Sequence, residues 1–187
     1  MIIAVDIDDV ITDTSLSLIA HAKLHETEVC EKGEILDHLA EIMRGGFPSP
    51  AVKKYFYRFM AEIMAEAKVK EGAAEVLSRL KEKGHTLVFI TARGEKRYPG
   101  STEVTKKFIA EEQLPCDAMV FDSVDKLEDC RSYRVDLLID DSVKNCTDVA
   151  AGGIRTLLFT SAVNKETETA LDRVENWQQL EKYIDNM

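Results

Sequence analysis

The chain has 187 residues, enough for one hydrophobic core together with a small inserted module. Hydrophobic residues make up 45% and charged residues 31% of the sequence, which is typical of a soluble globular protein and excludes a disordered one. The net charge of −10 argues against sequence-independent binding to nucleic acid polymers or to anionic membranes.

Cysteine usage and hydropathy indicate the compartment. Cys30, Cys116, Cys130 and Cys146 are scattered without a CxxC pair, and the sequence has neither a signal-like segment before its first apolar run nor a run of about 18 apolar residues. These features predict no membrane span and a reducing, cytoplasmic location. The sequence leaves a homodimer open.

Short apolar runs alternate with amphipathic stretches over most of the chain. The runs predict strands at 2–6, 86–91, 118–121, 135–140 and 154–159. The amphipathic stretches predict helices over 70–83, 101–113 and 177–184. Strands that alternate with helices in this way predict an α/β fold, a doubly wound parallel sheet with helices on both faces.

The segment from residue 14 to residue 69 interrupts this alternation. It carries three helical stretches, at 15–29, 34–43 and 50–67, and no convincing strand. Such a segment is far longer than an ordinary connection between a strand and a helix. We therefore expect a helical cap of residues 14–69, inserted after the first strand of an α/β core made of 1–13 and 70–187. Open α/β sheets bind ligands at the carboxyl ends of their strands, where this cap would lie.

Carboxylates gather where two of the predicted strands end. Asp6, Asp8 and Asp9 follow the first apolar run, and Asp140 and Asp141 follow the run LLI. Burying these charges unpaired would cost several kcal/mol each, and a hard cation such as Mg²⁺ removes that cost because it prefers oxygen ligands. The pattern indicates metal-dependent phosphate chemistry.

Asp6 and Asp8 suit a phosphoryl-transfer pair. Alternation along a strand places both on one side, so that one carboxylate can attack phosphorus while the other donates a proton to the leaving oxygen and later accepts one from water. A solvated acidic turn is the alternative for this pair. Asp9 and Asp13 are interpreted as loop or capping carboxylates.

Two further segments suit a phosphate. Thr91, Ala92 and Arg93 open the TARG loop after the second predicted strand, where a hydroxyl, backbone N–H groups and a positive charge could hold phosphate oxygens. Lys126 lies on a polar stretch between two strands and could neutralise the nucleophile and the phosphate. A threonine at a strand end and a surface lysine are the alternative readings of these residues when each is taken alone.

In this order the segments resemble the four motifs of the haloacid dehalogenase-like superfamily of phosphohydrolases. The resemblance rests on VDIDDVITD, VFITAR, Lys126 and LLIDDS, and it covers nearly the whole chain, including the position of that superfamily's helical cap. The compact cap, the IDDS motif and VENWQQL further resemble bacterial members of the 5′(3′)-deoxyribonucleotidase branch. Asp9 stands where many relatives have glycine, and aspartate tolerates the turn expected there.

The resemblance implies a role for each matching residue. Asp6 would be the nucleophile that forms an aspartyl-phosphate, and Asp8 the general acid and base whose backbone carbonyl also reaches the magnesium ion. Asp141 would be a direct metal ligand and Asp140 a ligand through water or an orienting group. Thr91 and Lys126 would bind the transferring phosphoryl group.

The predicted helix over 50–67 carries Tyr55, Phe56, Tyr57 and Phe59. Four aromatic side chains in five positions cannot share one helix face. Some of them would then line the space between cap and core, where a planar base can stack on an aromatic ring. Packing between cap helices is the alternative for each ring.

The expected reaction is hydrolysis of a small phosphorylated substrate, a deoxynucleoside monophosphate first, with a sugar phosphate or another small metabolite as the alternative. Two other classes remain as rivals. A phospho-acceptor receiver domain also combines acids, Mg²⁺, threonine and lysine, but it is shorter and has no inserted cap. An inactive binding protein with a cap is disfavoured because all four motif positions are filled.

Overall fold

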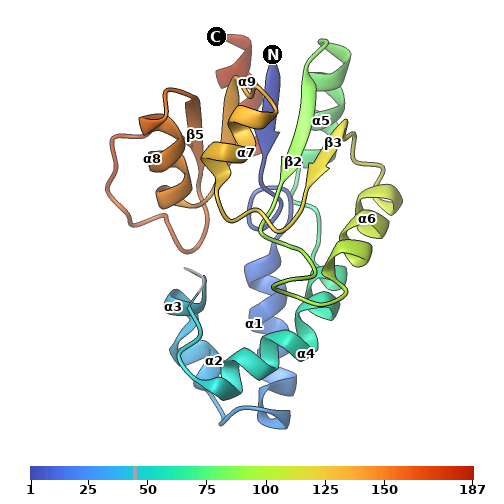
Figure 1. The fold of residues 1–187 in the computed structure, drawn as a ribbon, viewed down its shortest axis with the longest axis vertical. Coiled ribbons are helices and arrows are strands. Elements are labelled where there is room, and N and C mark those ends of the chain that lie inside the picture. Colours follow the sequence, from blue (N-terminus) through green and yellow to red (C-terminus); the bar gives the residue numbers. More distant parts are fainter. Residues whose placement is uncertain (44–45) are drawn as a thin grey trace.

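The computed structural model describes residues 1–43 and 46–187, and its centre is a six-stranded sheet (Figure 1). The spatial order is β3-β2-β1-β4-β5-β6, and every pairing between these strands is parallel. The strands are β1 (Ile2–Val5), β2 (Thr86–Ile90), β3 (Ala118–Val120), β4 (Leu137–Asp140), β5 (Arg155–Phe159) and β6 (Arg173–Val174). The predicted doubly wound α/β fold is confirmed.

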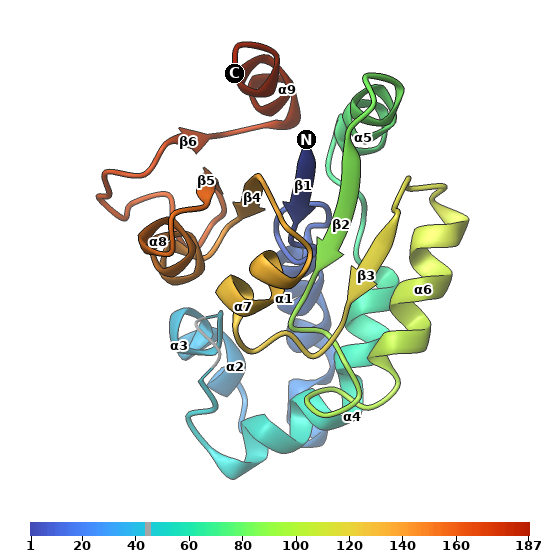
Figure 2. The same ribbon diagram turned by 45° about the horizontal axis from the view of Figure 1, so that its top comes forward.

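Helices cover both faces of the sheet, as Figure 2 shows. One face packs against α5 (Ala73–Glu82), α6 (Ser101–Glu111) and α9 (Trp177–Asp185), and the other against α7 (Lys126–Ser132) and α8 (Val143–Ala151). Because successive side chains of a strand point to opposite faces, Ile3 and Val5 join the first apolar cluster while Ala4 joins the second. Burial on both faces explains why the strands read as continuous apolar runs.

The helices between β1 and α5 form a separate layer beyond the carboxyl ends of the strands (Figure 1). They are α1 (Thr14–His25), the 3₁₀ turn η1 (Glu26–Glu28), α2 (Glu34–Asp37), α3 (Leu39–Met43) and α4 (Pro50–Glu66). We refer to α1 through α4 as the helical insertion. Its apolar side chains form their own cluster, centred on α1 and α4. At the start of α4, the Ser49 hydroxyl accepts the Val52 N–H, and Pro50 occupies the first helical position.

Two adjacent segments connect the helical insertion to the sheet. Thr12 bridges antiparallel to Val69, the Asp13 N–H donates to the Lys68 carbonyl at 2.9 Å, and the Lys70 ammonium lies 2.5 Å from Asp13 Oδ1. The chain therefore leaves the core and returns to it at one place.

The C-terminal helix is fixed to the loop that follows β1. Trp177 is only 1% exposed, and its indole N–H donates to the Val10 carbonyl at 3.1 Å. This contact links α9 to the segment that carries Asp6, Asp8 and Asp9.

The sequence predicted the positions of five strands but neither β6, which has two residues, nor α7 and α8, which are short and largely polar outside. The helix predicted over 34–43 is broken at His38, where φ is −107°. The helix predicted over 70–83 begins only after Gly72, whose φ of +81° is left-handed.

Candidate active site

The two central strands bring the first and last acidic motifs together. The chain runs from β1 outward to β3 on one side and from β4 outward to β6 on the other, so β1 and β4 are neighbours at a topological switch point. Val5 pairs with Ile139, and the Asp6 N–H donates to the Ile139 carbonyl at 2.9 Å. Asp6 and Asp140 therefore stand side by side at the carboxyl edge of the sheet.

Asp6, Asp140 and Asp141 form a carboxylate cluster there. Each offers an oxygen, and these oxygens lie within 4.8 Å of one another. Asp6 is 8% exposed and Asp140 is fully buried. Converging carboxylate oxygens are the donors that hard divalent cations prefer, so the donor set fits such an ion.

Lys126 reaches this cluster from the first residue of α7. Its ammonium donates to Asp6 Oδ1 at 2.6 Å and to the Ile90 carbonyl, and it lies 3.1 Å from Asp140 Oδ2. Burial alone would lower the pKa of Lys126, but Asp140 and Asp6 outweigh it and raise this pKa above its ordinary value. The lysine is therefore held in its charged form.

One lysine does not neutralise three clustered carboxylates. Burial raises the pKa of Asp6 to about 7, with Asp140 and Asp8 adding to the rise and Lys126 opposing it. Burial, followed by the charges of Asp140, Asp9 and Asp6, also raises the pKa of Asp141 well above its usual range. The cluster therefore has an excess of negative charge, which a proton or a cation would neutralise.

Three neighbouring residues that the sequence analysis did not single out orient Asp140 and Asp141. The Ser142 N–H donates to Asp140 Oδ1 at 2.8 Å, and Asn145 Nδ2 lies 3.1 Å from Asp140 Oδ2. Asn164 Nδ2 donates to the Asp141 carbonyl at 2.6 Å. Ser142 also caps α8. The SxxN spacing after the acidic pair was therefore an available signal for Ser142 and Asn145. Asn164 had no such signal because it comes from the loop after β5.

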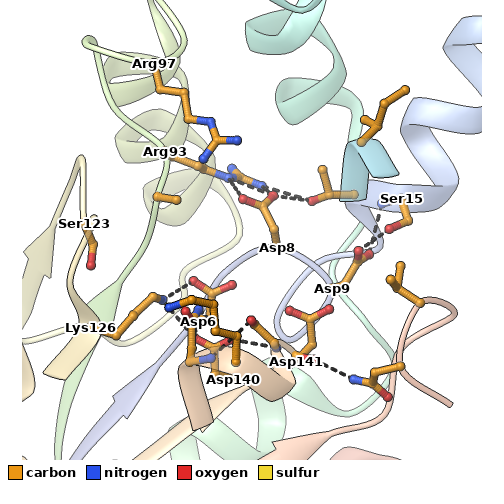
Figure 3. Close-up of a pocket in the computed structure, with 18 of the residues that line it drawn as sticks. Asp6, Asp8, Asp9, Ser15, Arg93, Arg97, Ser123, Lys126, Asp140 and Asp141 are labelled. Atoms are coloured by element: carbon orange, nitrogen blue, oxygen red, sulfur yellow. Dashed lines mark hydrogen bonds and ion pairs between the residues drawn. The ribbon is translucent and has the colours of Figure 1, made fainter. Parts of the chain in front are cut away.

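Asp8 belongs to a second group, directed away from the carboxylate cluster (Figure 3). The Arg93 guanidinium binds it through two nitrogens, and the Thr14 hydroxyl donates to Oδ1 at 2.6 Å. Burial would raise the pKa of Asp8, but the charge and hydrogen bonds of Arg93 and the bond from Thr14 bring it below its ordinary value. The carboxylate is therefore held ionised and in one orientation.

Asp9 is a turn and capping residue, as the sequence predicts. Its φ is +58°, a left-handed conformation that aspartate tolerates. Its carboxylate accepts the Ser15 N–H at 3.0 Å and the Ser15 hydroxyl, and it thereby binds an N–H of the first turn of α1. Asp13 precedes that helix and pairs with Lys70.

The loop after β2 lies beside these groups. Thr91 is fully buried, and its hydroxyl accepts the Arg93 N–H at 3.1 Å. Ala92 and Arg93 line the cavity described next, with Thr91 behind them at the end of β2. All the site residues predicted from the sequence thus lie at the carboxyl edge of the sheet, in two groups centred on Asp6 and Asp8.

A cavity of about 790 Å³ separates the carboxyl edge of the sheet from the helical insertion. Its polar wall includes both groups of site residues, and its apolar wall comes from α1, α3 and α4, through Leu18, Ile42, Phe56, Met60 and Met64. Arg97 and Tyr98 contribute from the loop after β2. An apolar wall opposite convergent charges suits a ligand with one anionic and one apolar end.

The predicted aromatic positions on α4 divide into three environments. Phe56 lines the cavity. Tyr55 and Phe59 are buried in the apolar cluster of the helical insertion, where the Tyr55 hydroxyl pairs with His21 Nδ1 at 2.5 Å. Tyr57 is 44% exposed. Of these four aromatic residues, Phe56 is the one that the structure places in the wall of the cavity.

The switch-point cluster of Asp6, Lys126, Asp140 and Asp141, beneath a helical insertion after β1, defines a hydrolase of the haloacid dehalogenase-like class. Residues 1–186 match the model of the family described as 5′ nucleotidase, deoxy (pyrimidine), cytosolic type C protein. The chain belongs to this family of phosphatases, and it is an enzyme.

Solved structures share the fold. A predicted phosphatase from Clostridium acetobutylicum is 21% identical, with a TM-score of 0.69 over 99% of this chain and 98% of that one. A predicted phosphoglycolate phosphatase from Haemophilus somnus is 13% identical, with a TM-score of 0.64 over 98% and 97%. A haloacid dehalogenase family hydrolase from Deinococcus radiodurans, with bound phosphate and sodium, is 16% identical, with a TM-score of 0.61 over 99% and 95%. No curated protein matches the sequence.

Two other expectations concern partners. Within residues 1–43 and 46–187, no helix is both long enough and apolar enough to cross a membrane. The relatives and the fold give no support to the homodimer that the sequence left open.

Proposed function

We propose that the protein is a Mg²⁺-dependent phosphomonoester hydrolase that acts through an aspartyl-phosphate on Asp6, with (deoxy)nucleoside monophosphates as substrates. The observation that carries this proposal is the position of Asp6. Its carboxylate lies between Lys126 and the acids at the end of β4, facing a cavity whose opposite wall is apolar. A cytoplasmic location accompanies the proposal and agrees with the description of the family.

The metal ligands would be the carboxylates of Asp6 and Asp141 and the backbone carbonyl of Asp8, with Asp140 binding directly or through water. When bound, Mg²⁺ supplies positive charge that offsets the carboxylates and the phosphoryl oxygens. Asp140 is already oriented by Ser142 and Asn145, which suits a supporting role.

The reaction has two halves. An Asp6 oxygen attacks phosphorus as the bond to the leaving oxygen breaks. Asp8, which is ionised in the free protein, takes up a proton from solvent when the substrate binds and gives it to that oxygen. Asp8, now ionised, then takes a proton from the water that attacks the aspartyl-phosphate, which releases inorganic phosphate and restores Asp6. Lys126, the Thr91 hydroxyl and the backbone N–H of Ala92 would stabilise the transferring group, because such transfers depend mainly on positioning and charge neutralisation.

We further propose that residues 14–69 act as a cap on a core of 1–13 and 70–187. The apolar wall that α1, α3 and α4 present to the cavity would receive the part of the substrate that carries no charge. A nucleobase fits this wall because Phe56 offers an aromatic face and Met60 and Met64 adapt to flat rings.

A small-metabolite phosphatase is the second candidate. It is favoured by the similarity to the predicted phosphoglycolate phosphatase, whose fold this chain shares over nearly its whole length. The two candidates differ in the substrate and not in the chemistry at Asp6.

Phosphate release from a panel of nucleoside monophosphates, deoxynucleoside monophosphates and sugar phosphates, with Mg²⁺ or with EDTA, tests the proposal. We expect release that requires Mg²⁺ and is fastest with nucleotides. Asp6→Asn should remove it, while Asp185→Asn, an exposed aspartate at the end of α9, should leave it unchanged. Activity that persists in Asp6→Asn would refute the mechanism, and equal rates across the panel would refute only the nucleotidase assignment.

A further inference from the structure

Arg93 has an environment that its position on a phosphate-facing loop does not explain. Its side chain is fully buried, whereas arginine is almost never fully buried unless it is paired. Figure 3 shows it directed at Asp8 and not at the carboxylate cluster around Asp6. Its partner is therefore within the protein.

Arg93 contacts Asp8 through two different nitrogens. Nε lies 3.1 Å from Oδ1 and 3.2 Å from Oδ2 of Asp8, and Nη2 lies 2.7 Å from Oδ1. A planar guanidinium that binds a carboxylate through two nitrogens fixes the plane of that carboxylate as well as its position. A single charged contact would leave Asp8 free to rotate.

Other elements fix the guanidinium in turn. Nη1 donates to the Thr105 hydroxyl on α6 at 3.2 Å, and Nη2 lies 3.2 Å from the Thr14 hydroxyl and 3.4 Å from that of Thr12. All three nitrogens of Arg93 thus have protein acceptors. Thr14 also donates to Asp8, so the carboxylate is held from two sides, by the β2 loop and by the start of α1.

We propose that Arg93 is a positioning residue that acts through Asp8, holding the Asp8 carboxylate in the orientation needed for proton transfer, and that its guanidinium is not a ligand of the substrate phosphate. The inference rests on the proposed function, because it needs Asp8 to be the acid and base. It reassigns the side chain of a residue that the sequence predicts to bind phosphate.

A double-mutant cycle between Arg93 and Asp8 tests the proposal, with p-nitrophenyl phosphate as the substrate. Arg93→Lys keeps the positive charge but lacks the planar fork, and we expect kcat to fall by about 10-fold to 100-fold together with KM, so that kcat/KM is nearly unchanged. In the Asp8→Asn background, the same substitution should change kcat by less than about twofold, because its effect passes through Asp8. If Arg93→Lys lowers kcat as much in the Asp8→Asn background as it does in the parent protein, the proposal is overturned.

The time course separates positioning from phosphate binding. p-Nitrophenolate leaves without needing a proton, so Arg93→Lys should retain a burst of one p-nitrophenolate per enzyme followed by a slow steady state, since only the water-dependent half still needs Asp8. A ligand of the phosphate would slow the burst itself and weaken inhibition by inorganic phosphate. Either of these results would assign Arg93 to the substrate instead.

Thr105→Val provides a second variant in case Arg93→Lys does not fold, since it removes one anchor of the guanidinium and leaves Arg93 and Asp8 in place. We expect a fall in kcat of about threefold to tenfold with kcat/KM nearly unchanged and a burst retained. An unchanged kcat in a folded Thr105→Val variant counts against the proposal.

The activity of the unsubstituted protein distinguishes failure of the proposed function from failure of the role proposed for Arg93. If it releases no phosphate from any phosphomonoester with Mg²⁺, the proposed function fails, and the role of Arg93 fails with it. If it is active and the cycle is additive, only the role of Arg93 fails.

Discussion

The Lys126 ammonium lies 2.6 Å from Oδ1 of Asp6, although the two residues are 120 positions apart in the chain. The contact exists because β1 is a central strand and α7 begins with Lys126 at the carboxyl edge of the sheet. It places one positive charge against the carboxylate that we propose as the nucleophile.

Replacing this lysine by an apolar residue of similar length should separate its effects on activity and on stability. We expect Lys126→Met to lower phosphate release by at least about 100-fold, because the transferring group loses a preorganised positive charge. Without Mg²⁺ the variant should also lose about 3 kcal/mol of unfolding free energy, since buried carboxylates lose their partner.

Activity assays and denaturant unfolding of Lys126→Met check both expectations. Lys107→Met is the matched control, because Lys107 is 72% exposed on α6 and pairs only with Glu111 among the contacts described. A Lys126→Met variant that resembles this control would contradict the assignment.

The stabilisation by Mg²⁺ should depend on pH. Burial raises the pKa of Asp6 from 3.8 to about 7, so the folded protein keeps a proton that the unfolded chain has already lost. The stability of the metal-free protein should therefore fall as the pH rises from 3.8 to about 7 and should change little from this group above that range.

A cation competes with that proton, so Mg²⁺ should raise the unfolding temperature more at about pH 8 than at about pH 5. At a concentration of 100 times Kd, the gain is about 2.7 kcal/mol. Thermal unfolding with and without Mg²⁺ at both pH values provides the measurement. Equal shifts at the two pH values would mean that Asp6 does not hold the ion, and Asp141→Asn should reduce both shifts.

The aromatic residues of α4 allow a comparison between two buried rings. Phe56 is 3% and Phe59 is 7% exposed, but only Phe56 of the two lines the cavity. We expect Phe56→Leu to raise KM for a nucleoside monophosphate by about tenfold, the lower end of what stacking on a base contributes. Phe59→Leu should destabilise the protein to a similar degree without raising KM.

Glycerol phosphate, which has no base, is the control substrate, and Phe56→Leu should leave its KM unchanged. Steady-state kinetics of both variants with both substrates test whether Phe56 contacts the base. If the two variants raise KM for the nucleotide equally, the change reflects loosened packing and Phe56 does not contact the base.

An ion pair far from the cavity should contribute to the way in which folding stability falls at acidic pH. Glu181 accepts two hydrogen bonds from Arg79 and one from Lys83, and these bonds lower the pKa of Glu181 from 4.5 to about 2. Its contribution to stability is present above pH 4.5 and disappears as the pH falls through about 2. Glu181→Gln should cost about 1 kcal/mol or less near neutral pH, because the partners are exposed.

Urea unfolding of the parent and of Glu181→Gln across the acid range tests this expectation. The difference between the two proteins should shrink steadily below pH 4.5. A constant difference at every pH would show that the loss comes from packing and not from charge.

The sequence predicted the sheet well because its strands are buried on both faces and therefore read as short apolar runs. It predicted the cluster of Asp6, Lys126, Asp140 and Asp141 because parallel strands deliver their carboxyl ends to one edge. The partners of Arg93 could not be predicted in this way. A guanidinium reaches several ångströms from its backbone, and its choice between a substrate and Asp8 depends on Thr14 and Thr105, which come from other elements.

The bridge between Thr12 and Val69 bears on how such enzymes diversify. Because the chain enters and leaves the helical insertion at neighbouring points, a different insertion could span the same two points without altering the register of β1 against β2 or β4. Evolution can thus exchange the apolar wall that we propose to select the substrate, while the acidic edge and its lysine stay as they are. On this proposal, chemistry and selectivity are inherited as separable parts of one chain.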